Sequence, residues 1–135
     1  MASIYDDIRS ALEVKLNSIA DLPDVAWENV SYSPTTGQSY VRPKLIPTRR
    51  EPAVRGLNPQ MYYQGMYRVD CFVPTGAGPS AADDLADKII DAFEATTDVV
   101  NGSTIVSIRY AERDMGVAED TFYSVGVDIG WYIYS

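Results

Sequence analysis

The chain has 135 residues, of which 46% are hydrophobic and 22% charged, and its formal net charge is −8. This composition is typical of a globular protein and excludes a disordered chain. Because there is no histidine and only one cysteine, the sequence excludes His-based catalytic triads, His-ligated zinc and a thiolate metal site.

No apolar run approaches the roughly 20 residues that a membrane-spanning helix needs. We therefore expect residues 1–135 to form a single domain with no membrane contact, no cofactor and no enzymatic activity.

The charges are unevenly distributed along the chain. The net charge is −4 over residues 1–39, +5 over residues 40–68 and −9 over residues 69–135. An acidic body of this kind repels nucleic acid, so we expect no direct nucleic-acid recognition. Two copies would attract each other if the basic strip of one met the acidic body of the next.

The first predicted element is an amphipathic helix over Ser3–Ala20. Ser3 and Asp6 have the spacing of an N-terminal capping box. Apolar side chains recur along this helix at spacings of three and four residues: Ile4, Ile8, Leu12, Leu16 and Ile19.

After the helix, a short edge strand is expected within Val25–Val30.

The basic strip begins with an extended segment, Tyr40–Ile46. Pro43 and Pro47 have no backbone N–H to donate, which places this segment at the edge of a sheet. The next segment, Thr48–Met61, has almost no apolar periodicity. We predict a long flexible loop at about 48–61, and loops of that length are usually functional or disordered.

The acidic second half contains the clearest periodic patterns. In the strand predicted over Thr104–Tyr110, one face is expected to carry Val106, Ile108 and Tyr110. The expected elements are a strand over Tyr62–Pro74, a helix capped by Ser80 and ending near Phe93, a strand over Thr104–Tyr110, a polar connection over Ala111–Asp120 and a strand over Phe122–Tyr134. The sequence thus predicts an α+β fold with a mixed or antiparallel sheet of about four to five strands and two helices packed on one face.

Arginines and tyrosines near the predicted loop form the first candidate site. They are either a nucleic-acid patch, with rings that stack on bases, or a protein-contact surface. The acidic remainder of the chain favours the protein contact, although ordinary half-buried sheet tyrosines are equally compatible with the pattern. The residues are Arg49, Arg50, Arg55, Tyr62 and Tyr63.

Four aspartates share one face of the second predicted helix and form the second candidate site. This acidic ridge could loosely hold a divalent cation, but a solvated face or a docking surface for a neighbour's basic residues is favoured, and we expect no metal. Its members are Asp83, Asp84, Asp87 and Asp91.

Two further features have simpler interpretations. The Gly76–Gly78 turn before the second helix resembles a phosphate loop, but no lysine follows and Pro79 removes one amide, which favours a turn and helix cap. Cys71 alternates with Val69 and Val73, so we expect a small core residue and not a reactive thiol.

The order of several short motifs is familiar. After the first helix comes Trp27-Glu28-Asn29, and before the arginine-bearing loop come Tyr40-Val41-Arg42-Pro43 and Leu45-Ile46-Pro47. The long strand begins with Tyr63-Gln64-Gly65-Met66-Tyr67 and ends with Phe72-Val73-Pro74. The series ends with the turn Gly76-Ala77-Gly78, with Phe93 at the end of the second helix, and with Val125-Gly126-Val127-Asp128-Ile129 in the last strand. Over nearly its full length the chain resembles the tail terminator proteins of long-tailed bacteriophages, in the group of small lambda-like terminators.

This resemblance implies a virion structural protein with helices on a mixed sheet. It implies a homo-oligomer, a ring of six subunits that caps the head-proximal end of the tail tube, stops tube polymerisation and offers a docking surface for the head connector. The implied partners are the tail tube protein and the head–tail connector, with the tape measure protein as a further candidate and assembly in the host cytoplasm. Carried onto this chain, the resemblance implies subunit or tube contacts in the loop Thr48–Met61, with Arg49, Arg50 and Arg55 as its charged members.

Two other classes remain as alternatives. A head–tail joining or neck protein of the virion would have the same size and ring habit but would leave tail length normal when absent. A small acid-rich hydrolase without histidine comes third, because no residues converge on a reaction.

Overall fold

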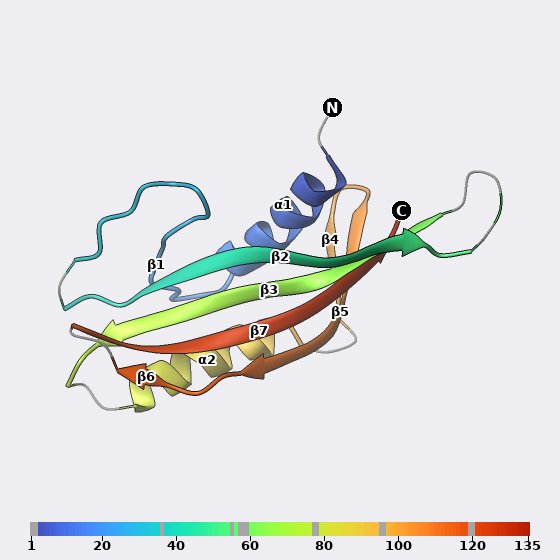
Figure 1. Cartoon of the computed structure of the whole chain (residues 1–135). Coiled ribbons are helices and arrows are strands. Elements are labelled where there is room, and N and C mark those ends of the chain that lie inside the picture. Colours follow the sequence, from blue (N-terminus) through green and yellow to red (C-terminus); the bar gives the residue numbers. More distant parts are fainter. Residues whose placement is uncertain are drawn as a thin grey trace.

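The computed structural model describes residues 3–35, 37–54, 56, 60–76, 79–94, 97–118 and 121–135. Within these described residues, two helices and seven strands follow one another (Figure 1). They are α1 (Ile4–Asn17), β1 (Asp24–Val25), β2 (Tyr40–Pro52), β3 (Met61–Pro74), α2 (Ser80–Ala92), β4 (Asp98–Asn101), β5 (Thr104–Arg113), β6 (Val117–Ala118) and β7 (Phe122–Tyr134).

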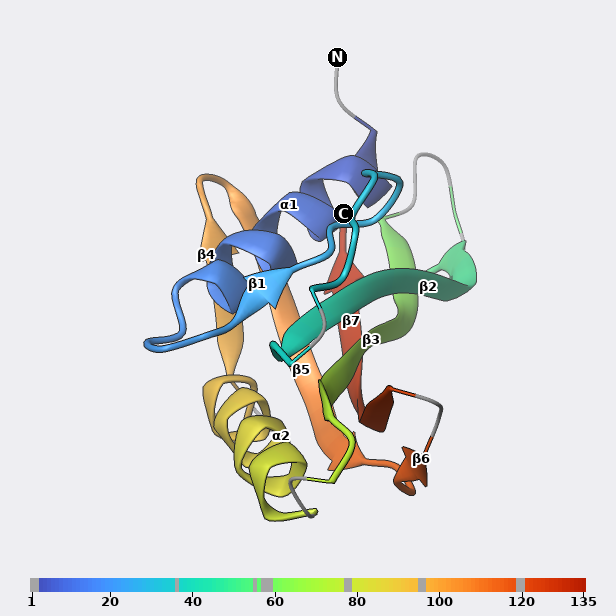
Figure 2. The same ribbon diagram turned by 90° about the vertical axis from the view of Figure 1, so that its left-hand side faces the viewer.

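All seven strands belong to one curled sheet, in the order β1-β2-β3-β7-β5-β4, with β6 paired to β7. Every pairing is antiparallel except that of β1 with β2. Figures 1 and 2 show the long strands β2, β3 and β7 winding across the molecule as a half-barrel. Strands make up 48% of the structure and helices 22%.

The prediction of four to five strands with two helices packed on one face is therefore wrong. β4 was not predicted, and β6 lies within the predicted polar connection, because strands of four and two residues are too short to show a period. The helices also contact different parts of the curled sheet: α1 contacts β4 and β5, while α2 contacts β7, β3 and β5.

One buried cluster lies on the inner face of the sheet, which we define as the face that bears the core side chains. Along β7, Val125, Val127, Ile129, Trp131 and Ile133 all belong to it. Both helices add their apolar stripes: Ile8, Ala11, Leu12 and Leu16 from α1, and Ala82, Leu85, Ala86 and Ile89 from α2. The side chains that alternate with the core residues define the outer face of the sheet.

Several element boundaries match the predictions closely, and others do not. β7 spans the predicted residues, and Ser3 caps α1 by accepting a hydrogen bond from the Asp6 amide at 3.1 Å. The N-cap position of α2 is occupied by Pro79, without a side-chain cap. The predicted loop is shorter than expected, because β2 continues to Pro52 and β3 begins at Met61.

Most of β2 lies at the edge of the sheet. β1 pairs with it only at Tyr40 and Val41, so the rest of its outer edge has no strand partner within the described parts of the chain. The prolines at 43 and 47 suit this position, because neither has an N–H to leave unpaired.

Candidate assembly surfaces

The far end of the β2–β3 hairpin holds four of the candidate contact residues, which the sheet divides between its two faces. Arg49 lies opposite Gln64 and Arg50 lies opposite Tyr63. The register shifts between Pro47 and Arg49, so that Thr48 is an extra residue in the strand. This bulge turns Arg49 to the outer face, whereas strict alternation from the buried Leu45 would have turned it inward.

On the outer face, a tyrosine cluster lies beside Arg49. The ring of Tyr62 lies 6.1 Å from that of Tyr132 and 5.1 Å from that of Tyr134, centroid to centroid. The Tyr62 hydroxyl donates to Gln64 Oε1 at 2.8 Å, and Arg109 donates to the same oxygen at 3.1 Å. These side chains therefore form an amphipathic surface of the kind enriched at protein interfaces.

The charge of Arg49 on this surface is only weakly neutralised. Its Nη1 lies 3.7 Å from Glu51 Oε1, and both side chains are at least half exposed. Exposed pairs of this kind contribute little to stability. A hollow of about 320 Å³ lies here, lined by Arg49, Glu51, Pro52, Ala53, Tyr62, Gln64, Arg109 and Tyr134. The guanidinium of Arg49 is thus available to a partner.

On the inner face, Tyr63 is a core residue. It is 7% exposed and meets the ring of Tyr5 edge-on at 5.7 Å. The exposed Arg50 covers it, with the guanidinium carbon 5.9 Å from the ring centroid. Arg50 is therefore the member of this pair that a partner can reach. Arg55, the third predicted arginine, lies outside the described residues.

The acidic ridge of α2 is partly used within the chain. Asp83 accepts a hydrogen bond from Arg113 Nη1 at 2.5 Å, which raises the pKa of Arg113. Asp84, Asp87 and Asp91 are exposed. Among the described residues, no group of side chains suited to holding a metal ion was found.

The hairpin end and the ridge lie apart in the molecule. Figures 1 and 2 both show the C-terminal end of β2 and helix α2 in different regions. The two sites therefore form separate surfaces of opposite charge.

A charged cluster centred on Arg68 was missed in the sequence. Arg68 donates to Asp70 at 3.0 Å, to Asp128 at 2.8 Å and to Asp114 at 3.0 Å. Burial acts to lower the pKa of Arg68, but the hydrogen bonds to these carboxylates outweigh it and raise the pKa. The Met115 amide and Arg68 together lower the pKa of Asp114. Asp70 lies two residues from Arg68 on β3, but Asp114 and Asp128 lie far away in the sequence, so no local motif indicated the cluster.

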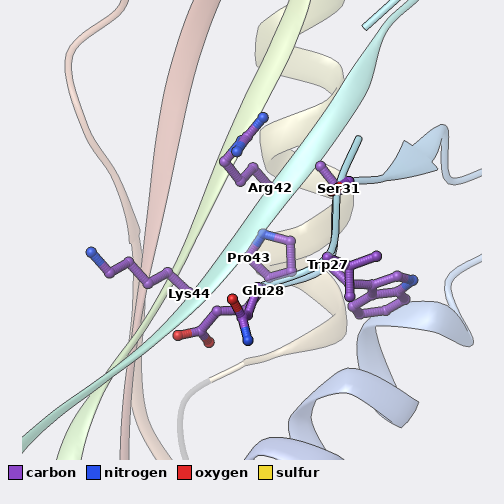
Figure 3. Close-up of a pocket in the computed structure, with 9 residues that line it drawn as sticks. Trp27, Glu28, Ser31, Arg42, Pro43 and Lys44 are labelled. Atoms are coloured by element: carbon purple, nitrogen blue, oxygen red, sulfur yellow. The ribbon is translucent and has the colours of Figure 1, made fainter. Parts of the chain in front are cut away.

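A second hollow, of about 490 Å³, lies between β2 and the turn that follows β1 (Figure 3). Glu28 holds this turn against β2: its Oε1 accepts from the Leu45 amide at 3.1 Å and from Arg9 Nε at 3.3 Å. The lining residues are Ala26, Trp27, Glu28, Asn29, Val30, Ser31, Arg42, Pro43 and Lys44.

Comparison with known proteins gives a clear family match. The family model described as phage tail terminator protein matches residues 7–131. A solved structure aligns with a TM-score of 0.74 over 97% of this chain and 96% of the other, at 24% identity, which shows a shared fold. No protein of curated function matches the sequence. Within the described residues, none of the helices has the length and apolar character to cross a membrane.

Proposed function

This chain belongs to the phage tail terminator family, a family of virion structural proteins, and we propose that it caps the head-proximal end of the tail tube as a ring. In this role it stops tube polymerisation and then offers a docking surface to the head connector. The family match over residues 7–131, which agrees with the resemblance predicted from the sequence motifs, carries the proposal. It supports a structural role in the phage tail and no catalytic one.

The distribution of charge supports a ring. A closed ring needs two different, complementary patches on every subunit, because the contacts run head to tail. The exposed basic side chains of β2 and the exposed aspartates of α2 provide surfaces of opposite charge in different regions of the molecule. Opposite charge on separate surfaces favours association between copies over neutralisation within one copy.

The hairpin end is the surface that we assign to the assembly contact with the tube or the neighbouring subunit. Arg49 and Arg50 supply charge on opposite faces of the same strand, and the cluster around Tyr62 supplies rigid aromatic area. Aromatic residues and arginine are the residue types most often found at energetically important interface positions.

Electron microscopy of lysates from the phage with a stop codon in this gene tests the proposal. We expect over-long tail tubes without heads, because tube growth has lost its cap. Tails of normal length lying beside filled heads would contradict the proposal and identify a head–tail joining protein. Intact, infectious particles would contradict both roles.

A further inference from the structure

Arg42 and Lys44 are two neighbouring cations of β2 for which the described parts of the chain provide no carboxylate partner. Arg42 contacts the ring of Tyr40 at 6.0 Å, and no ion pair is formed by Lys44 within those parts. Asp70, opposite Arg42, accepts from Arg68. The two positive charges are therefore available to an outside partner.

The two cations border the larger hollow. Figure 3 shows Arg42 and Lys44 projecting in different directions from β2, on either side of Pro43, with Trp27 to one side and the Glu28 side chain against β2. Glu28 adds no free negative charge, because its carboxylate is bound by Arg9 and by the Leu45 amide. Val30, which is 61% exposed, adds an apolar side chain to the wall. The hollow thus combines positive charge with an apolar wall.

A partner cannot enter this hollow by adding a strand to β2. The edge of β2 at this point consists of Pro43, which has no N–H, and of Leu45, whose N–H already donates to Glu28. Backbone pairing is blocked on both sides of Lys44. The occupant must therefore be recognised through its side chains.

The exposed aspartates of α2 have the chemistry and the spacing to pair with these cations. Residues two apart on a strand, such as Arg42 and Lys44, have Cα atoms about 6–7 Å apart. Helical residues three or four apart, such as Asp84 and Asp87, have Cβ atoms about 5–6 Å apart. Ala81, one turn before Asp84, is exposed and small enough to lie against Val30.

These aspartates cannot come from the same copy of the chain. Arg42 and Lys44 lie opposite Asp70 and Arg68 of β3, which alternate with the buried Val69 and Cys71 and so lie on the outer face. Helix α2 packs on the inner face through Leu85 and Ile89. The sheet itself separates the ridge from the hollow within one subunit.

We infer that the hollow at Arg42 and Lys44 is the docking site for helix α2 of a second copy of this chain, with Asp84 and Asp87 as the pairing carboxylates. The inference rests on the proposed ring and deepens it. It assigns the subunit contact to this hollow and leaves Arg49 and Arg50 to the tail tube.

Thiol crosslinking in assembled tails tests this contact. The variant carries Lys44→Cys and Asp87→Cys in the same chain, and a short bismaleimide joins the two thiols where subunits meet. We expect a ladder of covalent multimers up to the full ring, whereas either single variant gives none. The native chain should not react with the bismaleimide, because its cysteine, Cys71, is fully buried and burial raises the pKa of the thiol to about 12.

Two crosslinking results would overturn the inference. One is the absence of a ladder although the double variant is present in the tails. The other is a ladder from Arg50→Cys with Asp87→Cys in place of the hollow pair, which would move the ridge to the hairpin end. Absence of the native chain from purified tails would instead refute the proposed function, and the inference with it.

Exchanging the charges of the two sites gives a second test of the contact. Recovery of incorporation into tails by the exchange could not be caused by misfolding. Arg42→Asp with Lys44→Asp is expected to abolish the incorporation of the chain into tails. Adding Asp84→Lys and Asp87→Lys restores the opposite charges and is expected to restore incorporation. Failure of the fourfold variant to recover, although each double variant folds with the native melting temperature, would overturn the pairing.

Discussion

Arg68 lies directly over Gly126. A Cβ atom at Gly126 would lie only 2.1 Å from Nη2 of Arg68, so the bare backbone of β7 provides the space in which the guanidinium rests. From this position Arg68 reaches Asp70 on its own strand, Asp128 on β7 and Asp114 in the connection after β5. One arginine therefore joins three segments of the outer face.

Removing this arginine is expected to destabilise the fold at neutral pH. Arg68→Met keeps most of the side-chain length but leaves three carboxylates close together without their cation, which we expect to cost about 1–2 kcal/mol. Arg109→Met is the matched control, because Arg109 donates only to the neutral Gln64 within the described residues. Urea unfolding of both variants measures the difference, and equal stabilities would contradict the prediction.

The cost of Arg68→Met is also expected to depend on pH. The folded pKa of Asp114 is lowered, by the Met115 amide and by Arg68. Stabilisation from a lowered pKa is present above the unfolded value, about 3.9 for Asp, and disappears as the pH falls through the folded value. The difference between native and variant stability should therefore shrink in acid. A difference that stays constant from pH 7 to pH 3 would contradict this mechanism.

Two glycines of the sheet should respond very differently to a methyl group. At Gly65, a Cβ would lie 2.5 Å from the Ile46 carbonyl oxygen and 2.6 Å from Cζ2 of the buried Trp131. Neither group can move freely, so Gly65→Ala is expected to cost about 3 kcal/mol. At Gly126 the obstacle is the end of a flexible arginine, so Gly126→Ala should cost less. Thermal unfolding of both variants measures the two losses of stability. A larger loss for Gly126→Ala than for Gly65→Ala would contradict the packing argument.

The hydroxyl of Tyr67 is expected to be dispensable. Tyr67 is 1% exposed, its hydroxyl has no hydrogen-bond partner among the described residues, and burial raises its pKa. An unpaired buried hydroxyl is unfavourable, so Tyr67→Phe should leave the melting temperature unchanged or higher. Tyr67→Ala, which leaves a cavity beside Phe93, should cost about 3–5 kcal/mol. A marked loss of stability in Tyr67→Phe would show that the hydroxyl is bonded after all.

The sequence predicted the long periodic elements well because a single period covers each of them. In β7, thirteen residues alternate without interruption between core and outer face, and the predicted bounds are the observed ones. In α1, the capping residue and the apolar stripe both predicted the same helix. β4 and β6 were too short for such a signal, and each is stabilised by antiparallel pairing with the strand that follows it in the chain, β4 with β5 and β6 with β7.

Bulges account for the side chains whose face was mispredicted. An extra residue reverses the alternation after it, and nothing local in the sequence marks such a position. In β5 the register shifts between Ile108 and Tyr110, so Tyr110 lies on the outer face over Gly130, not with Val106 and Ile108 in the core. In β2 the bulge at Thr48 determines that Arg49 lies on the outer face and Arg50 on the inner face. The charge of the candidate site was predictable, but its division between two faces was not.

Charge reversal at both of these arginines is the direct test of the hairpin end. Arg49→Glu with Arg50→Glu places two negative charges where the proposal needs positive ones, and like charges across an interface cost several kcal/mol. We expect the double variant to lose its association with the tail, measured by its absence from tails purified after complementation of the stop-codon phage. Lys15→Glu, at the end of α1, is the control and should still be incorporated.

The fold should survive the double reversal, because both arginines lie at the exposed end of β2 and make only weak contacts, Arg49 with Glu51 at 3.7 Å and Arg50 with the ring of Tyr63 at 5.9 Å. A native melting temperature would therefore assign any loss of association to the interface and not to unfolding. Normal incorporation of the double variant would exclude the hairpin end as an assembly contact. The single variants Arg49→Glu and Arg50→Glu, measured in the same way, then show which face of the sheet meets the partner.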